Sequence, residues 1–297
     1  MGNASAEATG RAGQSCWSRA AFNGFQGPAI FALAQLIWSV LPMPVGLSPL
    51  VAAAASTALF MGLALYVSWN AARTLRQAGE RWLLVGLGLA LWLAPTALRL
   101  KSGVDHPVLR AMADCGLLSL AAAAGTAGAT AMPDLNILLP VGLFIGAVDF
   151  FVVHYGTVAV ALEHPVGQQV MQALTVRTPP TQPGLPGAMV GFADILLLAF
   201  FYSCIRRFGL RERASSALFF LALGGTLWAV QVDWIKVVPA LIPMGAAFLV
   251  ANWGCFRLSR QEWLLTGGLA ACVALFYLWY LLWMRPAINA GVRMFAG

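Results

Sequence analysis

The stretch that decides the fold runs from position 136 to 161 and reads NILLPVGLFIGAVDFFVVHYGTVAVA. A helix needs roughly 20 apolar residues to cross a bilayer, and similar runs recur along the chain. Of the 297 residues, 60% are hydrophobic and 10% are charged, whereas about 25% are charged in soluble domains. The composition therefore excludes a soluble globular domain and a disordered chain. It predicts an all-α fold, a polytopic transmembrane helical bundle.

The apolar runs between charged residues predict about nine spans. They cover residues 24–42, 47–69, 81–99, 108–131, 136–161, 186–205, 214–231, 237–256 and 262–284. Residues 1–23 are small and polar, which is typical of a disordered tail. The chain then divides into N-terminal transmembrane helices (24–135), a core (136–256), and an additional C-terminal transmembrane helix with its tail (257–297).

The net charge of +7 reflects basic residues that lie between the apolar runs. This distribution is typical of the positive-inside bias of membrane proteins, so the expected surroundings are a lipid bilayer and not nucleic acid. The densest basic loop holds Arg206, Arg207, Arg211 and Arg213, and we expect it to be cytoplasmic. The span count places the N-terminus on the same side. Because Arg far outnumbers Lys, we expect a prokaryotic cytoplasmic membrane.

Two acidic residues, Asp149 and Asp194, lie inside predicted spans, where ionisable groups are costly and mark functional sites. Each ends the pattern G-x-x-x-G-x-x-D, formed by Gly142, Gly146 and Asp149 in one span and by Gly187, Gly191 and Asp194 in the next. In a helix this spacing puts both glycines on the face of the carboxylate. Because small residues let helices approach closely, we expect these glycines to bring the two spans, and hence the two carboxylates, together.

Two carboxylates facing each other in a bilayer cannot easily both ionise, so they are expected to share one proton. Aspartic proteases use such a pair: the carboxylate accepts a proton from the attacking water, and the acid partner protonates the developing oxyanion. The pattern leaves two other readings open. Each aspartate could cap a broken helix or bind a neighbouring span, or the pair could relay protons or cations in a transporter.

A third element precedes the eighth predicted span, where Pro239 and Pro243 lie four residues apart in the segment Pro239-Ala240-Leu241-Ile242-Pro243. Prolines at a helix start leave backbone groups unpaired. At membrane depth this is tolerated where the backbone is buried in protein or lines a wet cavity. We therefore expect this segment to be buried in protein or to line a wet cavity.

An aspartate-bearing span, a following span with a G-x-x-D core and a later Pro-Ala-Leu resemble the presenilin and signal-peptide-peptidase group of intramembrane aspartyl proteases. The resemblance covers residues 136–256. It implies a catalytic pair, Asp149 and Asp194, and substrate-binding positions at Gly191, Phe192, Ala193, Pro239, Ala240 and Leu241. Val148 replaces the family's tyrosine and Ala193 its second motif glycine, so a non-catalytic relative is a further alternative.

The resemblance also implies a substrate, a single transmembrane helix that unwinds and pairs its extended end with the enzyme. The partly alternating stretch from Val170 to Val176 is the candidate partner strand. It belongs to the longest predicted loop, 162–185, which we expect on the outer face.

Other residues point to no further chemistry. His154, Glu163 and His164 match no zinc signature, and we expect no metal and no cofactor. Asp114 lies four residues after Arg110, which is typical of a pair on one helix face. The five scattered cysteines are expected to act as small buried hydrophobic residues. The sequence does not predict an oligomeric state.

Overall fold

The computed structural model describes residues 22–39, 48–103, 106–154, 165–178, 188–235, 238–280 and 282. Nearly all of them are helical, which confirms the predicted fold class. The elements are a helix at 22–39, α2 (Pro49–Thr74), α3 (Ala78–Ser102), α4 (Pro107–Thr130), α5 (Leu138–His154), α7 (Pro165–Ala173), β1 (Thr175–Arg177), β2 (Met189–Gly191), α8 (Phe192–Arg207), α9 (Glu212–Gln231), α10 (Leu241–Asn252), a 3-10 turn (Trp253–Cys255) and α11 (Arg260–Trp279). Residues 1–21 of the predicted tail lie outside the described ranges.

Within the described ranges, five helices are long and apolar enough to cross a membrane: α2, α3, α4, α9 and α11. Two more apolar helices are shorter, at Leu138–Val153 and Leu241–Cys255. A helix occupies part of every predicted span, but the predicted number of about nine spans is not confirmed by length and composition.

Local sequence explains where several helices begin and end. The Ser48 hydroxyl accepts the Val51 N–H and Pro49 opens α2, because a proline at the first helical position sacrifices no hydrogen bond. Ser259 and Glu262 form a reciprocal capping box at the start of α11. Gly103, with φ 67°, ends α3 in the left-handed conformation that glycine adopts without strain.

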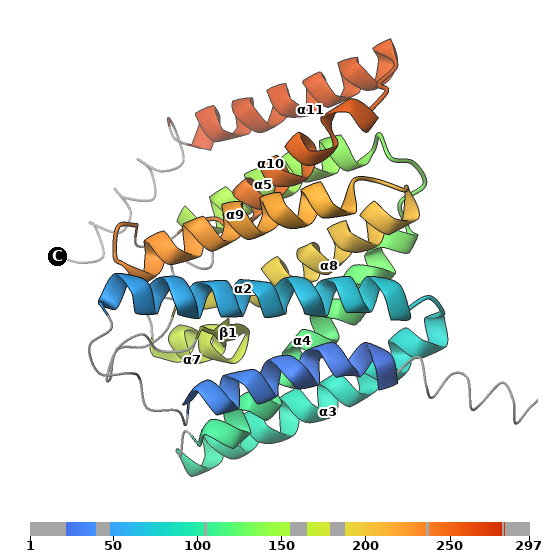
Figure 1. Cartoon of the computed structure of the whole chain (residues 1–297). Helices are drawn as coiled ribbons and strands as arrows, with labels where there is room; N and C mark the ends of the chain where they lie inside the picture. Colours follow the sequence, from blue (N-terminus) through green and yellow to red (C-terminus); the bar gives the residue numbers. More distant parts are fainter. Residues whose placement is uncertain are drawn as a thin grey trace, which may run out of the picture.

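The helices pack side by side, with α3 and α11 at opposite edges of the bundle (Figure 1). In the interior, α8 packs mainly against α4 and α2 and also contacts α10 and α9. Its side chains form much of the core, including the buried Phe200, Phe201 and Tyr202. At the edge, α11 contacts α5 and is almost fully exposed. The most central helix therefore begins just before Asp194.

The end of the bundle that carries the arginine cluster is held by polar contacts. The Arg207 guanidinium donates to the carbonyl oxygens of Ala129 and Thr130, at 2.7 and 2.8 Å. Arg73 lies 3.3 Å from Glu212. These contacts place the ends of α4, α8 and α2 and the start of α9 at one level. Which side of a membrane this end faces stays a prediction.

A short hairpin precedes α8. β1 and β2 pair antiparallel, with Thr175 opposite Gly191 and Arg177 opposite Met189. The predicted partner strand was wrong over residues 170–173, which belong to α7, while Thr175 and Val176 do lie in β1. Residues 170–173 lack the strict alternation of a strand, and polar residues recur on one helical face instead.

The hairpin lies within the bundle and not outside it as a loop. The indole N–H of Trp92, near the middle of α3, donates to the carbonyl oxygen of Ala173 at 2.9 Å. The Gln35 amide donates to the carbonyl oxygen of Arg177 at 2.8 Å. The end of α7 and β1 therefore pack at the depth of the helices. Irregular backbone is tolerated there because protein surrounds it.

Candidate functional site

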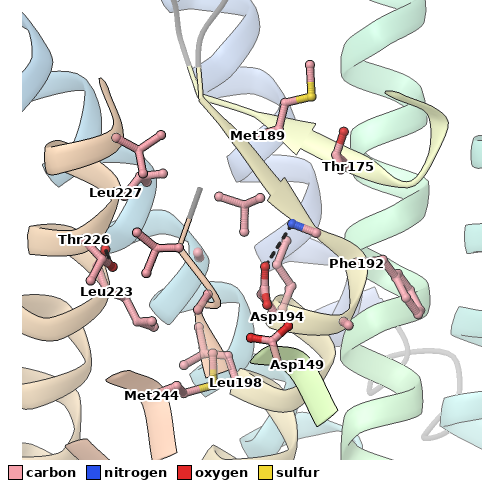
Figure 2. Close-up of a pocket in the computed structure, with 18 of the residues that line it drawn as sticks. Asp149, Thr175, Met189, Phe192, Asp194, Leu198, Leu223, Thr226, Leu227 and Met244 are labelled. Carbon is pink, nitrogen blue, oxygen red and sulfur yellow. Dashed lines mark hydrogen bonds between the residues drawn. The ribbon is translucent and has the colours of Figure 1, made fainter. Parts of the chain in front are cut away.

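Asp149 and Asp194 line one cavity of about 590 Å³. Side chains of α2, α5, α7, β1, β2, α8, α9 and α10 form its wall, which is mostly apolar. Figure 2 shows both carboxyl groups directed into this cavity and facing one another. The sequence prediction that these two residues come together is therefore confirmed in its geometry.

Asp149 is held by the Pro-Ala-Leu segment. It lies five residues before the last residue of α5, and its Oδ2 accepts the backbone N–H of Leu241 at 3.0 Å. Leu241 is the first residue of α10, so this N–H has no partner within its own helix. The segment that the resemblance assigns to the site thus contacts Asp149 through the Leu241 N–H.

Asp194 is held by the turn that starts its own helix. It is the third residue of α8, and its Oδ2 accepts the backbone N–H of Gly191 at 3.0 Å. A carboxylate in the first turn also interacts favourably with the helix dipole. The open alternative that an aspartate caps a helix is thus realised at Asp194, in addition to its place in the cavity.

The helical frame predicted around Asp194 was wrong. Met189–Gly191 forms strand β2, and the helix begins only at Phe192, so Gly191 does not share a helix face with Asp194. Gly187 lies outside the described residues. The repeated G-x-x-x-G-x-x-D pattern therefore describes two different local structures, because the three residues directly before α8 form a strand that pairs with β1.

Gly142 and Gly146 lie on a helix that approaches α10, and not α8 as predicted. A Cβ built at Gly146 would lie 3.7 Å from the Ile242 side chain, and one at Gly245 would lie 3.7 Å from the Gly142 carbonyl oxygen. Between α5 and α10, with Tyr277 of α11, lies a second cavity of about 440 Å³. These glycines thus open a space beside Asp149.

The predicted substrate-binding positions separate into two groups. Gly191, Phe192, Ala193 and Ala240 line the cavity of the two carboxylates. Leu241 lines the second cavity and reaches the first through its N–H. Pro239 lies directly before these residues, at the start of α10, and lines neither cavity.

The tightest glycine contacts lie on α4, where the sequence analysis assigned no role. A Cβ at Gly125 would lie 2.2 Å from the Leu196 carbonyl oxygen of α8, and one at Gly116 would lie 2.5 Å from the Trp92 nitrogen of α3. The signal was the run of small residues from Ala121 to Ala129, which permits close helix approach. This run of small residues does not identify the partner helices, because it permits close approach by any helix.

Several other predictions are confirmed only in part or lie outside the described residues. Asp114 and Arg110 are close enough for their charges to interact. Cys115 and Cys204 are buried, as predicted, whereas Cys272 is exposed, so that prediction was wrong for Cys272. His164 and Glu163 lie outside the described residues, and of His154 only the backbone is described.

Comparison with known proteins adds nothing to this geometry. No family model, no curated protein and no solved structure matches the chain.

Proposed function

We propose that the protein is an intramembrane aspartyl endopeptidase that cleaves single-span membrane protein or peptide substrates. The observation that supports this most is the pair of carboxyl groups, Asp149 and Asp194, facing each other in one cavity (Figure 2). Each carboxyl group is fixed by a backbone N–H, from Leu241 and from Gly191. Fixed, paired carboxyl groups provide a general base and a general acid without further reorganisation.

The reaction uses one proton shared between the two residues. The ionised carboxylate accepts a proton from water as the water oxygen attacks the peptide carbonyl carbon. The protonated partner donates its proton to the carbonyl oxygen, so the charge that develops there is neutralised. Return of a proton to the departing amide nitrogen then breaks the C–N bond. The apolar wall of the cavity suits a substrate segment with aliphatic side chains.

An extended substrate would pair with β2 in place of the predicted 170–176 stretch. The Phe192 N–H donates to the Leu174 carbonyl oxygen at 3.0 Å, and the Thr178 N–H donates to the Ala188 carbonyl oxygen at 2.8 Å. In the antiparallel register, these bonds turn the backbone groups of Met189 toward the other edge of β2, whereas the Gly191 N–H is already bound to Asp194. Met189 and Gly191 also line the cavity, so a strand added there would lie beside Asp194.

The test is cleavage of a single-span model substrate by the purified full-length protein in detergent, between pH 5 and 8. We expect cleavage by the wild type and loss of at least about a thousandfold in Asp149→Asn and in Asp194→Asn, because general acid–base catalysis contributes about 10²–10⁴-fold. Asp233→Asn is the matched control. Asp233 is exposed and has φ 60°, a conformation that Asn also adopts.

Absence of cleavage by the wild type in this pH range would contradict the peptidase proposal. If proton or cation flux into liposomes then depended on Asp149 and Asp194, the same pair would serve a transporter. If neither activity appeared, the chain would be a non-catalytic relative of the presenilin type. Retained cleavage in both Asn variants would show that the carboxyl pair is not the catalytic machinery.

A further inference from the structure

Polar side chains from several helices gather around β1, at the end of the cavity away from the arginine cluster. The Gln231 amide of α9 donates to the Thr178 hydroxyl at 2.9 Å, and the Gln35 amide of helix 22–39 reaches the Arg177 carbonyl oxygen. Asp114 of α4 interacts electrostatically with Arg177. A short strand inside an apolar bundle is thus surrounded by polar groups.

Four buried polar atoms in this region have no hydrogen-bond partner in the described part of the protein. They are Trp38 Nε1, Asp114 Oδ2, Thr175 Oγ1 and Gln231 Oε1, which we call the β1 polar cluster. Asp114 and Thr175 are only 6% and 7% exposed. Buried polar groups in folded proteins almost always pair with protein or with ordered water, so each of these atoms needs a partner.

The hydrogen-bonding character of the four atoms indicates which kind of molecule could pair with them. Asp114 Oδ2 and Gln231 Oε1 accept hydrogen bonds, Trp38 Nε1 donates one, and Thr175 Oγ1 does both. An anion needs hydrogen-bond donors, whereas Asp114 Oδ2 and Gln231 Oε1 only accept, and a metal cation would be repelled by the positive charges of Arg99, Arg110 and Arg177, which all act on Asp114. Water both donates and accepts, and therefore satisfies the whole set.

The cluster borders on the cavity of the two carboxylates. Thr175 lines that cavity and lies opposite Gly191 in the hairpin, and the Gly191 N–H holds Asp194. Toward the arginine-rich end, the interior is filled by the buried rings of Phe200, Phe201 and Phe248. Polar groups that could bind water therefore border the cavity at β1, whereas apolar rings fill the interior toward the arginine-rich end.

We propose that the β1 polar cluster holds ordered water and supplies it through Thr175 to the cavity of Asp149 and Asp194. That this water is the nucleophile of peptide hydrolysis rests on the proposed function. The presence of water in the cavity does not rest on it. Thr175 and Gln231 are accordingly positioning residues, since they act on the reaction through the water that they hold.

Hydroxyl-radical footprinting of the full-length protein in lipid nanodiscs tests the proposal, because radicals form from water and oxidise nearby methionines. Met61 and Met244 line the cavity and are 4% and 1% exposed, whereas Met132 lies after α4, outside the candidate spans, is partly exposed and reports the radical dose. We expect oxidation of Met61 and Met244 in the wild type. It should fall about fivefold relative to Met132 in Thr175→Val/Gln231→Leu, which loses hydrogen bonds to the water.

Thr57→Val is the matched control, because the Thr57 hydroxyl is also buried without a partner, on α2 and outside the cavity lining. It should leave the oxidation of Met61 and Met244 unchanged. Equal oxidation in the double variant and the wild type would overturn the proposal, whether or not the protein cleaves a substrate. Reduced oxidation with no cleavage by the wild type would retain the water path and reject the peptidase. With an active enzyme, the double variant should lower kcat and leave KM unchanged.

Discussion

The two carboxylates are carried by helices that are packed very differently. Asp194 lies on α8, which α4 approaches so closely that a Cβ at Gly125 would meet the Leu196 carbonyl oxygen at 2.2 Å. Asp149 lies on α5, where nothing lies within 4 Å of a Cβ at Gly142 and where residues of α5 and α10 line a second cavity. Glycines thus permit close contact in one half and leave space in the other. In this structure α8 is therefore the tightly packed side of the site and α5 the loosely packed side.

A substitution that fills the close contact between α4 and α8 should have the largest effect on stability. In Gly125→Ala, the new methyl group cannot be accommodated without moving α8, since the atom it meets belongs to the backbone. We expect a loss of about 3 kcal/mol of stability, at the upper range for overpacking. The measurement is thermal unfolding in detergent.

Gly142→Ala, on the loosely packed helix α5, is the control. Its methyl group meets open space, so replacing a helical glycine should be neutral or stabilise by about 0.5–1 kcal/mol. Equal melting temperatures of the two variants would show that the halves do not differ in packing.

A second substitution tests whether the Gly191 N–H positions the Asp194 carboxyl group at the start of α8. Gly191 has φ −70°, which proline adopts readily, so Gly191→Pro removes the N–H donated to Asp194 and keeps the backbone conformation. We expect a loss of about 10- to 100-fold in kcat, since a hydrogen bond to a charged group contributes about 1.5–3 kcal/mol.

Gly191→Ala keeps that N–H and adds a Cβ 3.3 Å from Asp194 Oδ2, so its kcat should stay closer to that of the wild type. If Pro and Ala reduced kcat equally, the N–H would not be what positions Asp194.

The smallest effect should come from the contact between α11 and α5. The Tyr277 hydroxyl donates to the Ala147 carbonyl oxygen, and the Tyr277 ring lies edge-on to Phe150. Tyr277→Phe removes only the hydroxyl, at a cost of about 1 kcal/mol, and should accelerate hydrogen exchange of the α5 amides.

Tyr202→Phe removes a comparable hydrogen bond, 2.7 Å long, to Ser216 on the tightly packed side. It should leave exchange in α5 unchanged. Acceleration of α5 exchange by Tyr202→Phe would show that α5 is not independently mobile.

The sequence predicted which residues meet better than it predicted the local structure that brings them together. Scarcity of charge in apolar runs singled out Asp149 and Asp194, because an ionisable group at membrane depth is costly. It could not show that Met189–Gly191 is a strand, since a three-residue strand has too few residues for a periodic pattern.

The sequence also did not predict which helix Gly142 and Gly146 contact. The spacing of Gly142 and Gly146 gave their shared face correctly but not the helix that this face meets. Consecutive spans were expected to be neighbours, whereas α5 packs against α10 and α11. Contacts between elements distant in sequence depend on the whole packing arrangement, and the pattern of one helix does not specify them.

One further consequence follows from the way α10 is attached. At its end, the Asn252 side chain donates to the Ser215 hydroxyl at 2.9 Å and accepts the Arg211 N–H at 3.0 Å. At its start, the Leu241 N–H binds Asp149, and the helix lies between the two cavities. The start of α10 is therefore attached to α5 through the carboxyl group of Asp149, and its end is attached to α9 through an amide. A hydrogen bond to an ionised acceptor is stronger than one to a neutral acceptor, so the strength of the attachment at the start of α10 depends on the charge of Asp149.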